Sequence, residues 1–96
     1  MITQEKIDAI VNNEKIAMKF INLWVRWQDE KEYEDINEYG KVMFETLTKQ
    51  LPNIGAEYLS VNKRPFGIRV KLDGRAWNIS VTRSGRGFSF GAMPVK

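Results

Sequence analysis

The sequence predicts an α+β fold in which two or three N-terminal helices pack on one face of a C-terminal three- or four-stranded antiparallel β-meander. Two observations lead to this prediction. Apolar residues recur with a helical period in the first half of the chain and alternate strictly in the second half. An Asp73-Gly74 turn signal separates two alternating runs. The 96 residues suit a single domain, 1–96, made of a helical half, 1–52, and a meander half, 53–96.

The N-terminal helices are expected in two segments. A first helix should begin at Thr3, a candidate N-cap. Asn12-Asn13 interrupts the helical pattern, and Asn13 is a candidate cap for a second, longer helix. From Ile16 to Trp27 that helix is apolar almost all round, so we expect it to be the most buried helix of the fold.

A third helix is predicted from about Asp35 to Gln50, after an acidic segment that begins at Asp29. Pro52 and Gly55 mark its end and the change to strand structure. Metal-binding carboxylates usually converge from different elements, so we interpret the acidic segment as a solvated helix end rather than a magnesium site. One face of the helix is apolar: Ile36, Tyr39, Met43, Leu47 and Leu51.

Residues 66–81 are predicted to form a β-hairpin with one apolar face. Asp73 and Gly74 suit a two-residue type I′ turn, in which both residues need positive φ angles. Closing this turn pairs Phe66 with Val81 and places every large apolar residue of the hairpin on one face, while Arg69 and Asn78 point the other way. A slip of one residue would destroy this separation, so pattern and turn chemistry support the same register.

Two further strands should complete the meander, one near Glu57–Val61 and one through Phe88 and Phe90. The parity of Phe88 and Phe90 matches that of Val81, so we expect both rings in the core. The segment 86–93 partly matches the signature of the RNA-recognition-motif family. Buried rings could not stack on bases, and this argues against membership of that family.

Charge is distributed unevenly along the chain. Residues 1–53 hold seven Lys/Arg and ten Asp/Glu, a net charge of −3, whereas residues 54–96 hold eight and two, a net charge of +6. Such asymmetry suggests an anionic partner for the C-terminal half. The alternative is that the two halves neutralise each other within the fold or across a dimer.

The outer face of the sheet is the predicted binding surface. Cations among small polar neighbours suit a phosphate backbone, where charge neutralisation dominates affinity. We therefore expect a small non-catalytic protein that binds DNA or RNA through this face and the adjoining turns. The candidate contact residues are Lys63, Arg64, Arg69, Lys71, Arg75, Asn78, Arg83 and Arg86.

The residue inventory excludes several kinds of chemistry. There is no histidine and no cysteine, so the usual general base, the usual zinc ligands and disulfides are all missing. We expect no enzymatic activity, no metal and no small-molecule cofactor. The alternative partner is an acidic protein surface, which would make the chain a small inhibitor or adaptor of the kind that phages and mobile elements encode. A remote alternative is a histidine-free toxin-type ribonuclease using Glu57, Tyr58, Arg69 and Lys71.

The start of the chain lacks the apolar run of a signal peptide, and no stretch approaches the ~20 apolar residues of a membrane span. We therefore expect a soluble cytoplasmic protein without a membrane partner. The final strand around Phe88 would leave an unprotected sheet edge, which makes a homodimer a further hypothesis.

Overall fold

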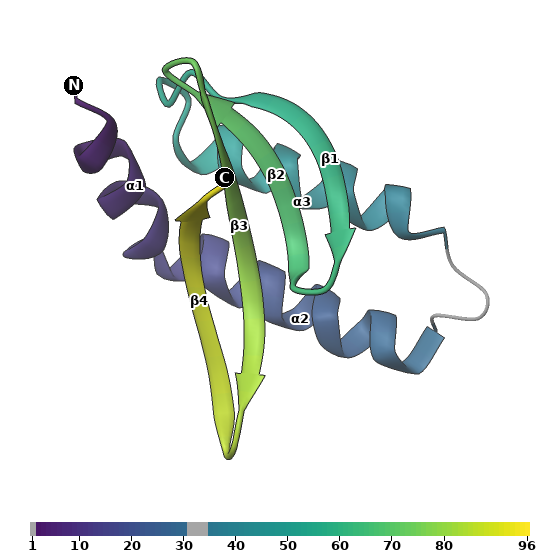
Figure 1. Ribbon diagram of the computed structural model, residues 1–96. Helices are drawn as coiled ribbons and strands as arrows, with labels where there is room; N and C mark the ends of the chain where they lie inside the picture. Colours follow the sequence, from purple (N-terminus) through teal and green to yellow (C-terminus); the bar gives the residue numbers. More distant parts are fainter. Residues whose placement is uncertain (1, 31–34) are drawn as a thin grey trace.

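The structure is a computed structural model that describes residues 2–30 and 35–96, and it confirms the predicted α+β arrangement (Figure 1). The four strands form one antiparallel meander in the order β1-β2-β3-β4, and the helices cover one of its faces. Residues 31–34 of the predicted acidic segment lie outside the described residues. The elements are α1 (Thr3–Val11), α2 (Glu14–Glu30), α3 (Ile36–Gln50), β1 (Glu57–Lys63), β2 (Phe66–Leu72), β3 (Arg75–Ser84) and β4 (Gly87–Pro94).

The β2–β3 hairpin has the predicted register and the predicted turn. Its Cα partners include Phe66 with Val81 and Arg69 with Asn78. Asp73 and Gly74 have φ angles of 49° and 83°, as a type I′ turn requires. The apolar face of this hairpin therefore forms the sheet side of the core, as the alternation indicates.

The core lies between the sheet and the helices. Phe66 connects its layers, because its ring stacks on Trp27 of α2 with centroids 5.3 Å apart and meets Tyr39 of α3 edge-on at 6.2 Å. Both long helices are thus packed against the same strand residue. The buried apolar residues are Ile7, Ile10, Ile16, Phe20, Leu23, Tyr39, Met43, Leu47, Ile54, Phe66, Ile68, Val70, Leu72, Ile79 and Val81.

Helix α3 approaches β1 closely because Gly40 occupies the contact. A Cβ atom at this position would overlap the Tyr58 hydroxyl and would lie only 2.7 Å from the Val61 Cβ. Burial of Tyr58 beneath the helix raises the pKa of its phenol above the usual value. The inner surface of β1 is therefore covered by α3 with no room for a side chain at residue 40.

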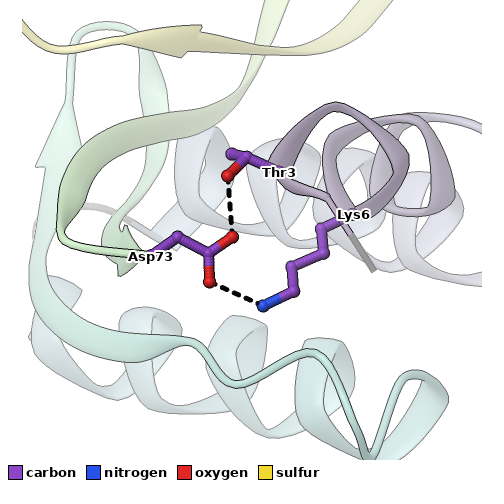
Figure 2. A network of polar contacts seen from close by, with 3 residues as sticks. All are labelled: Thr3, Lys6 and Asp73. Atoms are coloured by element: carbon purple, nitrogen blue, oxygen red, sulfur yellow. Dashed lines mark hydrogen bonds and ion pairs between the residues drawn. The ribbon is translucent and has the colours of Figure 1, made fainter.

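A polar contact joins α1 to the β2–β3 turn (Figure 2). The Thr3 Oγ1 donates to Asp73 Oδ2 at 2.7 Å, and the Lys6 Nζ donates to Asp73 Oδ1 at 2.8 Å. These hydrogen bonds, that from Lys6 first, lower the pKa of the Asp73 carboxyl. The prediction that Thr3 caps α1 is wrong, because Ile2 holds the cap position without a side-chain hydrogen bond and the Thr3 hydroxyl is used by Asp73.

Helix α2 begins as predicted but is less buried than predicted. The Asn13 Oδ1 accepts a hydrogen bond from the Ile16 backbone N–H at 3.0 Å, which confirms the Asn13 cap. The prediction that α2 is the most buried helix is wrong: Met18 and Val25 are exposed, and α2 has three buried residues among those described, whereas the shorter α3 has four. The sheet and the neighbouring helices cover α2 on one side only, and its other side meets solvent. None of the described helices is both long and apolar enough to cross a membrane.

The β3–β4 hairpin extends beyond the other strands, and this overturns the predicted burial of Phe88. The last residue of β3 that pairs with β2 is Val81, whereas pairing with β4 continues to Ser84. Phe88 lies on this extension with 38% of its surface exposed. Phe90 packs against the core, with its ring 5.2 Å from that of Phe20. The alternation of side chains correctly predicted the face on which Phe88 lies, but the helices cover that part of the face incompletely.

The two edges of the sheet differ. Strand β1 has a register shift between Tyr58 and Ser60 and carries the charged residues Glu57 and Lys63. Strand β4 has a continuous register with β3, contains no charged residue, and has no second strand partner among the described residues. Bulges and charges are the usual means by which an edge avoids pairing with another chain, and only β1 has them.

Candidate functional site

The face of the sheet that points away from the helices, here called the outer face, carries few bulky side chains. Arg69 lies at its centre, where its Nε donates to Asn78 Oδ1 at 3.2 Å. The Asn62 Nδ2 donates to the same oxygen at 3.0 Å. Arg69 is therefore held in place by neighbouring strands, while Lys71 on the same face is exposed. Several of the other residues on this face are small: Gly67, Ala76, Ser80 and Gly91.

The remaining predicted cations do not share the outer face. Lys63 and Arg83 pair across the sheet with Phe66 and Phe88, so their parity is that of the helix-covered face. Arg64 and Arg86 lie in the β1–β2 and β3–β4 turns, which are at the same end of the meander. We call these four residues the end group: Lys63, Arg64, Arg83 and Arg86.

Arg75 is separated from both sets. It begins β3, next to the Asp73-Gly74 turn at the opposite end of the sheet. Its guanidinium lies 5.5 Å from the centroid of the Trp77 ring, at the distance of a cation–π contact. The predicted contact set thus falls into three parts: the outer-face group of Arg69, Lys71 and Asn78, the end group, and Arg75 alone.

None of these seven cations forms an ion pair with a carboxylate in residues 2–30 or 35–96. Glu57 is the cross-strand neighbour of Lys71, yet the two side chains do not pair. Among the residues that the structure describes, one ion pair joins the two halves, between Lys6 and Asp73 at 2.8 Å. This ion pair neutralises a positive charge of the acidic half and a negative charge of the basic half. The charges that remain make the two halves more unequal. Neutralisation within the fold finds no support in the described contacts.

An open groove of about 350 Å³ lies between the β3–β4 hairpin and α2. Trp24 and Phe88 meet in it edge to face, with centroids 5.2 Å apart. The sequence pattern did not predict this groove, because alternation places Phe88 with the core residues. A signal was present, since alternation places Arg83 on the same face as Val81, where a core residue would be expected. The lining residues are Trp24, Val25, Gln28, Asp29, Arg83, Arg86, Gly87 and Phe88.

The four residues considered for a histidine-free ribonuclease do not converge. Glu57, Arg69 and Lys71 have the parity of the outer face. Tyr58 pairs with Val70, faces the helices, and lies against Gly40. Within the described parts of the chain, no three side chains of the metal-binding types are grouped so that they could hold an ion.

Chemically, the surface offers fixed positive charge, hydrogen-bond donors and, in the groove, aromatic rings. Arg69 is held by the hydrogen bond that its Nε donates to Asn78, so its two terminal nitrogens can donate to an anion in the paired geometry that guanidinium groups favour. These features suit recognition of a polyanion. Comparison of the chain with protein-family models, with curated proteins and with solved structures found no match.

Proposed function

We propose that the protein binds nucleic acid, without catalysing a reaction on it, through the outer-face group and the end group. One observation supports this proposal above the others: the seven cations of the predicted contact set have no carboxylate partner among the described residues. Phosphates of a nucleic acid would supply the missing anions. Each phosphate that a cation neutralises releases condensed counterions, and this release favours binding.

The two groups have different roles in this proposal. Arg69 is oriented by Asn78 and half-buried, so little side-chain freedom is lost when it binds a phosphate. Arg64 and Arg86 are exposed in turns and contribute long-range attraction instead. Specificity for a base sequence is not expected from the outer face, because contacts of its cations with phosphates carry no sequence information.

The proposal is tested by measuring the retention of random DNA and RNA at several salt concentrations. One double variant, Arg69→Gln with Lys71→Gln, removes the outer-face charges, and another, Arg64→Gln with Arg86→Gln, removes half of the end group. Each should reduce the slope of log K against log salt by roughly 1.4–1.8, which corresponds to two lost phosphate contacts.

The matched control is Lys15→Gln with Lys19→Gln, which removes the same charge from exposed positions of α2. It should leave the salt slope unchanged, and the midpoint of thermal unfolding should show that every variant is folded. Equal losses in the control and the site variants would mean that net charge, and not these groups, governs retention. Wild-type protein that retains neither DNA nor RNA at low salt would contradict the proposal and would favour an acidic protein partner.

A further inference from the structure

We infer that the groove between α2 and the β3–β4 hairpin is a binding site for one unpaired nucleobase and its adjoining phosphate, so that the nucleic acid bound is single-stranded. The inference rests on the proposed function and adds the class of nucleic acid to it. It is carried by three features of the groove: an exposed aromatic ring, two arginines, and a polar wall on α2.

The aromatic ring is that of Phe88. It is supported by the edge-to-face contact with Trp24 at 5.2 Å and still leaves 38% of its surface open. An aromatic ring fixed from one side and open on another is the usual platform for a base, whose π-face can stack on it whatever its sequence. The other large apolar side chains that are exposed in the described residues are all aliphatic: Ile2, Met18, Val25, Leu59 and Met93.

Two arginines on the hairpin place positive charge beside this ring. Arg83 pairs with Phe88 across β3 and β4, and Arg86 lies in the turn between them. Both line the groove, and neither pairs with a carboxylate within residues 2–30 and 35–96. A guanidinium group donates two parallel hydrogen bonds to a phosphate, so the hairpin wall suits the backbone of the strand.

The opposite wall is polar but not basic. Gln28 and Asp29 of α2 face the groove. The Gln28 amide can both donate and accept hydrogen bonds, whereas the Asp29 carboxylate accepts them and repels phosphate. The base edge therefore lies toward α2 and the phosphate toward Arg83 and Arg86. The volume of about 350 Å³ is within the range of small-ligand clefts, roughly 300–1,000 Å³.

A duplex cannot use this site. Within a double helix both faces of each base are covered by neighbouring bases, so Phe88 could stack only on a base that has left the stack. The end group lies at the same end of the sheet as the groove, and a single strand seated on Phe88 can continue over Lys63 and Arg64. The groove thus gives a reason for the protein to prefer a single strand over a duplex.

The test compares an oligothymidylate of about ten nucleotides with a duplex of the same length, by fluorescence anisotropy at fixed salt. Phe88→Leu keeps an apolar side chain against Trp24 but removes the ring, and it should weaken single-strand binding roughly five- to hundredfold. Phe88→Tyr keeps the ring and should bind like the wild type. Met18→Ala is the control, since Met18 is an exposed apolar residue of α2 that does not line the groove. Duplex binding should change little in all three variants.

The outcomes separate this inference from the proposed function. Binding of single strands and duplexes with equal affinity, unchanged in Phe88→Leu, would overturn the groove site and leave nucleic-acid binding intact. Retention of neither would overturn the proposed function itself. Binding of an oligoglutamate of about ten residues that is lost in Phe88→Leu, with no binding of oligothymidylate, would show that the groove takes an acidic peptide and would overturn the assignment to a base.

Discussion

Gly40 allows a sharp prediction because two physical effects on its replacement have opposite signs. Alanine is favoured over glycine in a helix interior by about 1 kcal/mol, so Gly40→Ala should stabilise α3 if nothing else changed. The added Cβ, however, would overlap the Tyr58 hydroxyl and would lie 2.7 Å from the Val61 Cβ. The outcome depends on which of the two effects is larger.

The contact with Val61 decides it. Tyr58 can turn its ring, but the Val61 Cβ is attached directly to the β1 backbone. Ordinary van der Waals contact begins near 3.4 Å, so α3 and β1 must separate by about 0.7 Å at this point. Overpacking of this kind costs roughly 1–3 kcal/mol. After subtraction of the helix gain, Gly40→Ala should lower the free energy of unfolding by up to about 2 kcal/mol.

Urea denaturation followed by tryptophan fluorescence measures this change as a lower midpoint at an unchanged m value. Gly91→Ala is the control, because a Cβ there meets nothing within 4 Å, and it should be neutral or slightly stabilising. In a Tyr58→Phe background the cost of Gly40→Ala should be smaller, since one of the two overlaps is removed. Gly40→Ala that is more stable than the wild type would refute the close approach of α3 to β1.

Two further predictions concern the contacts that hold the helices. The hydrogen bonds from Lys6 and Thr3 lower the folded pKa of Asp73, so they stabilise the fold above the unfolded pKa of about 3.9, and this stability is lost as the pH falls through the folded pKa. Asp73→Asn should therefore lower the thermal midpoint more at about pH 7 than at about pH 2, and an equal difference at both values would contradict the shift. Asn13→Ala should lower the free energy of unfolding by about 1 kcal/mol through loss of the α2 cap. An unchanged urea midpoint would mean that this cap contributes nothing.

The features that the sequence predicted correctly are determined by residues that lie close together in the chain. The Phe66–Val81 pairing follows from alternation and from the Asp73-Gly74 turn, and both lie within one short segment. Helix α3 ends at Gln50 because Leu51 precedes Pro52, and its Asp35 cap accepts a hydrogen bond from the Asn37 backbone N–H. These features need no knowledge of the rest of the chain.

Features that depend on distant residues were not predictable in this way. Thr3 has the composition of a cap, but its hydroxyl is taken by a carboxylate 70 residues away. Alternation assigns Phe88 to the helix-covered face, yet it does not say where that cover ends. For the same reason it could not show that Arg83 and Phe88 share a groove with Trp24. The sequence therefore predicted which residues are candidates for the site, but it did not predict which of them lie together in the structure.

The unprotected β4 edge has a consequence for how binding measurements are interpreted. Two β4 strands from separate copies could pair without bringing like charges together, because the strand has none. The homodimer hypothesis therefore implies that association depends on protein concentration, and a doubled sheet would present two outer faces to one nucleic acid. Titrations should be repeated at several protein concentrations alongside sedimentation measurements. An apparent affinity that rises with protein concentration would then report pairing of copies at β4 as well as contact with the nucleic acid.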